Sequence, residues 1–140
     1  MRDERHWLIH RLRGWGQQPA LIWRDEAWSY DQLCDAVDRW LAELLRRDIR
    51  PGATLAICGD YSPNLCALLV AALLNRNIVV PLAAATARSW NQMMDTAEVE
   101  FMIEFDLGDD WRLSHLGREV THPLLRQLSG CGAPGLILFS

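Results

Sequence analysis

Residues 50–82 read RPGATLAICGDYSPNLCALLVAALLNRNIVVPL, which is the pattern of a strand, a helix and a second strand. The apolar run Thr54–Cys58 is short and lies between Pro-Gly and Gly-Asp pairs, which favours a strand buried on both faces. Ser62 is a good helix N-cap, and Pro63 suits the first helical position. Ile78–Leu82 is a second apolar strand. The stretch therefore predicts a right-handed βαβ unit with parallel strands.

The remaining patterns add elements to this unit. Ser29 and Gln32 have the spacing of a capping box at the start of a helix. We expect further strands near residues 99–105 and 136–139, a short one at 111–113, a hairpin near 20–29, and helices over residues 3–14, 30–47, 86–97 and 123–128. The predicted fold class is α/β, with a mainly parallel sheet, helices on both of its faces, and a small N-terminal antiparallel hairpin.

The helix predicted after the βαβ unit begins at Thr86, whose hydroxyl can cap it, and ends at about Ala97. Its inward positions are Trp90, Met93 and Met94. A cluster of methionine and tryptophan is more often core filling than a ligand site, so we interpret these side chains as core.

Composition limits the kinds of function. Half of the 140 residues are hydrophobic and 23% are charged, which is typical of one globular domain. The net charge of −4 argues against a nucleic-acid partner, because such proteins carry a clustered basic face. All the basic residues are arginine. The absence of lysine excludes a Schiff base or a lysine phosphate clamp from this chain.

The cysteines and the N-terminus indicate a reduced, cytoplasmic protein. The sequence has four cysteines, at positions 34, 58, 66 and 131, and no two have C-x-x-C spacing. Cys34, Cys58 and Cys66 fall in apolar patterns, where a thiol acts as a small hydrophobe. The first five residues are mostly charged and do not resemble a signal peptide. The longest apolar run, residues 66–74, is too short to span a bilayer.

Two pairs of polar residues are candidates for a metal site and for a catalytic site. His6 and His10 are spaced to share a metal on a helix, but no third ligand is evident, so a solvated or stacking pair is the preferred interpretation. Glu100 and Glu104 share one face of a predicted strand. They lack a partner base, so we expect an exposed sheet edge rather than acid–base catalysis.

Three blocks in order resemble the adenylate-forming superfamily, which includes acyl-CoA synthetases, aryl-CoA ligases, peptide-synthetase adenylation domains and luciferases. The first is Trp28–Leu33, similar to the family's Thr/Ser-Tyr-x-x-Leu block. The second runs from Arg50-Pro51-Gly52 through Ser62-Pro63-Asn64 to Val79–Leu82. The third, Pro134–Ser140, is similar to the approach to the phosphate-binding loop.

Two departures from the family pattern weaken any assignment to a subfamily. Leu74–Asn77 stands where Lys-Ala-Gly is common before the Val-Pro-Leu strand. Ala83-Ala84 stands where Asn-Pro or Asp-Pro is common after it. Neither change removes a known catalytic residue of the family.

The resemblance implies an enzyme that uses ATP and Mg²⁺ to convert a carboxylic acid to an acyl-adenylate, and passes the acyl group to a thiol such as coenzyme A. Ser140 matches the position that opens the phosphate loop, and it is the single residue carried over as a nucleotide contact. The other catalytic residues of the family lie beyond it. Residues 1–140 are therefore expected to be an incomplete N-terminal subdomain, inactive alone.

The expected partners follow from this interpretation. They are the remainder of the parent chain, the carboxylic acid substrate, and further copies of the chain held through an exposed apolar face. The apolar run Leu136–Phe139 at the chain end supports the expectation of a longer parent.

A stand-alone α/β binding or interaction module remains the alternative. Gly59-Asp60 follows the first parallel strand, where such sheets bind ligands. However, CGDYSPN lacks the G-x-G-x-x-G fingerprint of dinucleotide folds, and no G-x-S-x-G nucleophile elbow occurs. The seven tryptophans could anchor a partner, although most fit core positions.

Overall fold

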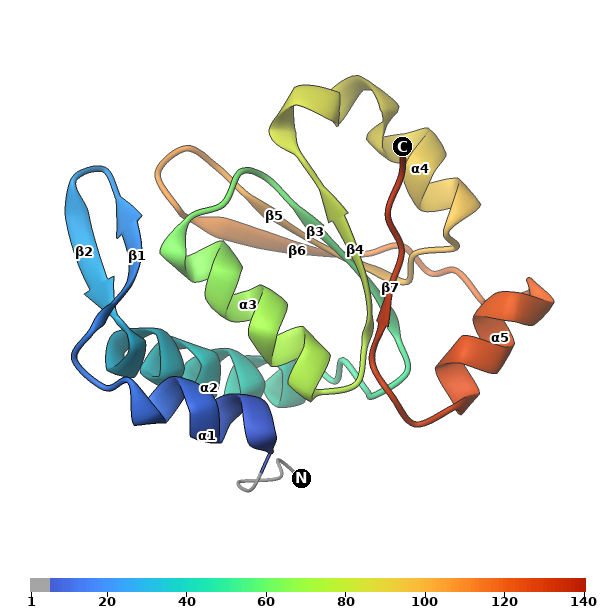
Figure 1. Ribbon diagram of the computed structural model, residues 1–140. Helices are drawn as coiled ribbons and strands as arrows, with labels where there is room; N and C mark the ends of the chain where they lie inside the picture. The colour runs from blue at the N-terminus through green and yellow to red at the C-terminus, as the bar shows by residue number, and fades with distance from the viewer. Residues whose placement is uncertain (1–5) are drawn as a thin grey trace.

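The computed structural model describes residues 6–140, in which five strands form one sheet and two more form a hairpin (Figure 1). The sheet has the order β6-β5-β3-β4-β7. Its strands are β3 (Thr54–Cys58), β4 (Ile78–Leu82), β5 (Phe101–Phe105), β6 (Trp111–His115) and β7 (Gly135–Leu136). All pairs are parallel except β5 with β6. The expected α/β class with a mainly parallel sheet is confirmed.

The central unit forms as the sequence predicts. β3 and β4 pair in parallel and are joined by α3 (Pro63–Leu74). The Ser62 hydroxyl accepts a hydrogen bond from Leu65 N at 3.1 Å, and Pro63 occupies the first turn. Every residue of β3 is buried, so this strand has a core on each side.

Helices cover both faces of the sheet. α2 (Tyr30–Arg46) and α3 pack on one face, where Leu55 and Ile57 point, with α1 (Trp7–Gly14) against α2. α4 (Trp90–Thr96) packs on the other face, where Ala56 and Cys58 point. This alternation along β3 follows from the two-residue period of a strand. α5 (Pro123–Gly130) lies beside β7, where Leu128 contacts the backbone of Gly135.

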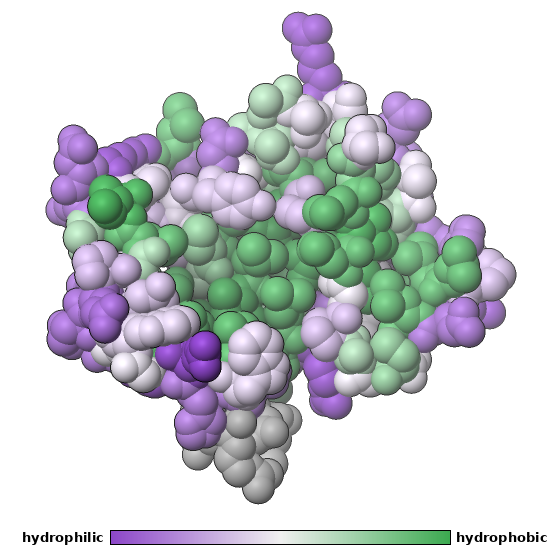
Figure 2. All heavy atoms as spheres, in the orientation of Figure 1, coloured by the Kyte–Doolittle hydropathy of each residue, from purple (hydrophilic) through white to green (hydrophobic). Residues whose placement is uncertain are grey.

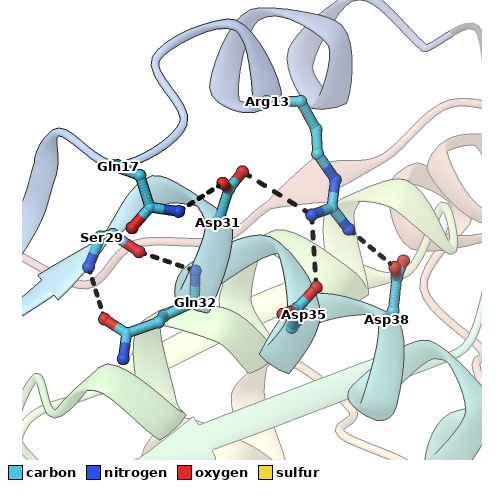
Figure 3. A network of polar contacts seen from close by, with 7 residues as sticks. All are labelled: Arg13, Gln17, Ser29, Asp31, Gln32, Asp35 and Asp38. Carbon is cyan, nitrogen blue, oxygen red and sulfur yellow. Dashed lines mark hydrogen bonds and ion pairs between the residues drawn. The ribbon is translucent and has the colours of Figure 1, made fainter.

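The N-terminal elements are confirmed where they are described. β1 (Pro19–Trp23) and β2 (Glu26–Ser29) form the expected antiparallel hairpin. Ser29 Oγ accepts from Gln32 N at 3.1 Å, and Ser29 N donates to Gln32 Oε1 at 2.8 Å, which completes the capping box (Figure 3). The helix expected from residue 3 is seen from Trp7; residues 3–5 lie outside the described part.

The prediction that Thr86 caps a helix is wrong. Residues Ala84–Ser89 form a 3₁₀ segment, η1, and α4 begins only at Trp90. Thr86 has non-helical backbone angles, and its hydroxyl donates to Ala83 O at 2.9 Å, a local turn that competes with capping. The core assignment of the cluster is confirmed, because Met94 is buried and Trp90 and Met93 pack against the same core.

The expectation of an exposed sheet edge at Glu100 and Glu104 is also wrong. β5 is an interior strand, because β6 pairs with its other side. Glu100 is buried, accepting from Thr54 N at 3.0 Å and from Arg50 Nη2 at 2.7 Å. The strand predicted at 111–113 is confirmed and extends to His115.

The last predicted strand is shorter and more exposed than expected. β7 comprises Gly135–Leu136, although Ile137 N still donates to Val79 O at 2.9 Å. Leu136 and Leu138 are 54% and 68% exposed. The reason is position: in the described chain β7 is an edge strand, with β4 as its one neighbour. Among residues 6–140, no helix is long and apolar enough to cross a bilayer.

Candidate functional site

The carboxyl ends of β3 and β4 define the candidate site. The chain leaves β3 toward α3 on one face of the sheet and leaves β4 toward η1 and α4 on the other (Figure 1). In open α/β sheets, neighbouring strands whose connections leave to opposite faces form a crevice at their carboxyl ends, and ligands bind there. This edge is therefore where the topology favours a ligand.

Short backbone contacts hold the two loops of this edge together. Gly59 N donates to Leu82 O at 2.9 Å, and Ala84 N donates to the Asp60 carboxylate at 3.3 Å. Gly59 has φ of +135°, and a Cβ there would lie 3.1 Å from Phe105 O. Only glycine fits this position without strain, so the loop has a fixed path across the ends of β3 and β5.

Ser140 lies on the same side of the sheet. It follows β7, which runs parallel to β4, so the chain leaves β7 in the direction of the carboxyl edge (Figure 1). The Ser140 side chain is exposed. The role of Ser140 as the start of a phosphate loop, and its contact with a nucleotide, stay predictions.

Burial raises the pKa values of three thiols, those of Cys34, Cys58 and Cys66. Burial, with a smaller effect of the Glu104 charge, raises the pKa of Cys58 to about 12. Burial also raises the pKa values of Cys34 and Cys66. The thiolate is the form that attacks or ligates, so a raised pKa disfavours these chemistries at the three thiols. Cys34 and Cys58 are buried as expected of small hydrophobes, whereas Cys131 is exposed.

The donor set of this chain does not by itself fit ATP and Mg²⁺. Within residues 6–140, no three His, Cys, Asp or Glu side chains are grouped to hold a metal. The sequence has no lysine, and no glycine-rich loop follows a strand. His6 is occupied as the N-cap of α1, where its Nδ1 accepts from Leu8 N at 3.2 Å, and its ring stacks near Trp7.

Sequence reasoning missed two pockets. One, of about 160 Å³, lies between α2, α3 and β6, where Trp40 Nε1 donates to Asn64 Oδ1 at 2.6 Å beside Trp111. The other, of about 440 Å³, lies at the amino ends of β3 and β5 and includes Arg50 and Arg118. The segments that line each pocket are far apart in the chain, so no local pattern could have grouped them.

With this geometry established, the chain can be compared with known proteins. The family model described as AMP-binding enzyme matches residues 8–128. The chain belongs to the AMP-binding enzyme family. The comparison with curated proteins gives no match.

Solved structures share the fold at low identity. The N-terminal subdomain of NpsA from Klebsiella oxytoca is 20% identical, with a TM-score of 0.70 over 94% of this chain and 36% of that one. The same subdomain in complex with 3-hydroxyanthranilyl-AMSN is 18% identical, with a TM-score of 0.71 over 95% of this chain and 36% of that one. The N-terminal domain of FACL13 from Mycobacterium tuberculosis is 18% identical, with a TM-score of 0.63 over 70% of this chain and 26% of that one.

These neighbours establish what the chain resembles in form. It has the fold of N-terminal subdomains of adenylate-forming enzymes. It spans about a third of the length of the first of these structures, so it corresponds to a portion of such an enzyme.

Proposed function

We propose that residues 1–140 form an incomplete N-terminal subdomain of an AMP-forming carboxylic acid–thiol ligase. The complete enzyme would use ATP and Mg²⁺ to form an acyl-adenylate and then transfer the acyl group to coenzyme A. It would act in the cytoplasm, where cysteine thiols stay reduced. The observation that carries the proposal is the AMP-binding family match over residues 8–128.

Two features of the chain support the assignment of roles. Ser140 would open the phosphate loop, because β7 directs it to the carboxyl edge of the sheet, where open α/β folds bind ligands. Phosphoryl chemistry in this fold needs a glycine-rich phosphate loop and a metal ligand; the sequence contains no such loop or lysine, and residues 6–140 contain no group of three metal ligands. The 140 residues would therefore position the start of the loop without catalysing a reaction.

The coding sequence beyond codon 140 provides the first test. We expect Ser-Gly-(Ser/Thr)-Thr-Gly to follow directly, in an open frame. The complete protein is then expected to catalyse ATP–pyrophosphate exchange with one of a panel of carboxylic acids, and the 140-residue chain serves as its inactive control. Formation of an acyl-CoA rather than an acylated carrier protein would identify the acceptor.

A stop codon after Ser140 would overturn the ligase proposal, because no catalytic residues would remain. The stand-alone binding or interaction module would then take its place, and the exposed apolar residues of β7 would be its first candidate surface.

A further inference from the structure

A second pocket lies at the opposite edge of the sheet from the candidate site. It is open to solvent, has a volume of about 440 Å³, and is lined by the segments leading into β3 and β5, residues 118–120, and α5. The Ser129 hydroxyl donates to Gly52 O at 2.9 Å, which fixes α5 against the loop before β3. The pocket is lined by three arginines and two glutamates among other residues: Arg50, Arg118, Arg126, Glu100 and Glu119.

One of the two glutamates is already neutralised. Glu100 Oε1 accepts from Arg50 Nη2 at 2.7 Å, and its Oε2 accepts from Thr54 N at 3.0 Å. The carboxylate is therefore fully engaged by the protein. Within the described part of the chain, Arg50 is paired through Nη2, and its side chain is 60% exposed, so its other donors can turn toward the pocket.

The other two arginines also keep unused donors. Arg118 Nη2 pairs with Asp95, but Arg118 Nη1 is buried without a hydrogen-bond partner among the described residues. A buried cationic donor without an acceptor is costly and uncommon in native proteins. Arg126 Nε donates to Val120 O at 3.0 Å, and its two Nη atoms have no partner within residues 6–140.

We propose that this pocket binds a small phosphorylated polyol or sugar. Guanidinium groups pair with phosphate oxygens through parallel hydrogen bonds, and three of them, from the loop before β3, from residues 118–120 and from α5, line this pocket. The pocket is larger than phosphate requires and has the size of an ordinary ligand site. Glu119, the remaining carboxylate, would accept hydrogen bonds from ligand hydroxyls.

Calorimetric titration of the 140-residue chain with glycerol phosphate at low ionic strength tests this proposal. We expect saturable binding that weakens as salt is added, because the contacts are charged. Arg118→Gln and Arg126→Gln are each expected to weaken binding at least about tenfold. Arg88→Gln removes an exposed arginine of η1, outside this pocket, and is expected to leave the affinity unchanged.

Inorganic phosphate separates recognition of the whole ligand from recognition of charge. The proposal requires glycerol phosphate to bind more tightly than inorganic phosphate, and Glu119→Gln to reduce that preference. Absence of saturable binding, equal affinity for the two probes, or equal losses in the Arg88 and Arg126 variants would overturn it. If loss of the Asp95 pair unfolds the Arg118 variant, Arg126→Gln decides alone, since that side chain is exposed.

Discussion

Asn77 shows how one buried amide can hold two segments together, the turn before β4 and the loop before β3. Its Nδ2 donates to Arg50 O at 2.9 Å and to Ala53 O at 3.2 Å, and its Oδ1 accepts from Asn75 Nδ2 at 2.8 Å. The residue is fully buried. The amide therefore replaces water for two carbonyls at the entrance to β3, directly beside the start of β4.

Replacing this amide tests that role. Asn77→Ala should lower the free energy of unfolding by about 2–3 kcal/mol, because Arg50 O and Ala53 O each lose one hydrogen bond and the Asn75 amide loses its Asn77 acceptor. Urea denaturation measures the loss. Asn91→Ala, an exposed change on α4, is the matched control and should have an effect within about 0.5 kcal/mol. A loss below about 1 kcal/mol for the Asn77 variant would contradict the assigned role.

Gly59 offers a second test, at the edge that carries the candidate site. Gly59→Ala combines a φ of +135° with a Cβ only 3.1 Å from Phe105 O, so we expect destabilisation by at least about 1–3 kcal/mol. Gly14→Ala is the control, because a Cβ there meets nothing within 4 Å. Equal unfolding midpoints for the two variants would show that the loop after β3 is free to move.

Among the elements, α5 is attached through a carboxylate outside it. Glu98, at the end of α4, accepts from Thr121 N at 2.6 Å and from His122 N at 2.8 Å, just before α5 begins. The hydrogen bond from the Thr121 backbone, helped by those from His122 and the Thr121 hydroxyl, lowers the pKa of Glu98. The ionised form is thus favoured in the folded state.

The lowered pKa of Glu98 predicts how stability depends on pH. A carboxylate with a lowered folded pKa contributes stability above its unfolded pKa, about 4.3, and loses it as pH falls through the folded pKa. We expect the melting temperature of the wild type to fall more steeply below about pH 4.3 than that of Glu98→Gln. Glu26→Gln, on the exposed hairpin, is the control. Parallel curves for the wild type and the Glu98 variant would exclude this linkage.

Arg13 of α1 forms ion pairs with α2, beside the packing of Ile9 against the core. Arg13 Nη1 lies 3.2 Å from Asp35 and 3.9 Å from Asp31, and its Nη2 lies 3.1 Å from Asp38 (Figure 3). The charges are well exposed, and such pairs contribute little each. The attachment is therefore local, and its loss should loosen α1 without unfolding the sheet.

Hydrogen exchange distinguishes this local role from a global one. Arg13→Ala should speed exchange of the α1 amides while changing the overall free energy of unfolding by less than about 1 kcal/mol. Arg11→Ala is the control, because Arg11 lies over the Trp15 ring of its own segment instead of contacting α2. Unchanged exchange in α1 would mean that apolar contacts such as that of Ile9 hold the helix.

Local signals explain which elements the sequence predicts correctly. The β3–α3–β4 unit and the Ser29 capping box depend on neighbours in the chain, so their patterns suffice. The interior position of β5 cannot be predicted from local patterns, because it depends on pairing with β6. Glu100 is buried for the same reason, since its partners Arg50 and Thr54 are brought to it by the fold.

In the whole molecule, the candidate site and the arginine pocket differ in how much of each follows from local sequence patterns. The edge of the sheet toward which the chain runs at Ser140 follows from the parallel pairing of β4 with β7, whereas the role of Ser140 stays a prediction. The arginines at 50, 118 and 126 are ordinary solvated charges in the sequence. They become a pocket only when α5 is packed against the loop before β3, a contact with no local signature.

The outer surface of the whole molecule leads to the last prediction. Figure 2 shows hydrophobic side chains gathered over the region where Figure 1 places α3, β4 and β7. β7 is an edge strand, and Leu136, Leu138 and Phe139 are 54%, 68% and 36% exposed. Apolar edge strands pair readily with other chains, and large apolar patches mark interaction surfaces. We therefore expect the 140-residue chain to self-associate as its concentration rises.

Sedimentation velocity over a range of concentrations measures this association. Leu138→Glu should shift the chain toward the monomer, because a charge on this edge would be desolvated in any pairing. Leu45→Glu changes a side chain that is 82% exposed on α2 and should leave the association unchanged. A wild type that stays monomeric, or equal dissociation by the two variants, would show that β7 is not the contact. If the wild type and the Leu45 variant associate and the Leu138 variant does not, the β7 edge is the contact. A covering segment or partner would then have to occupy this surface.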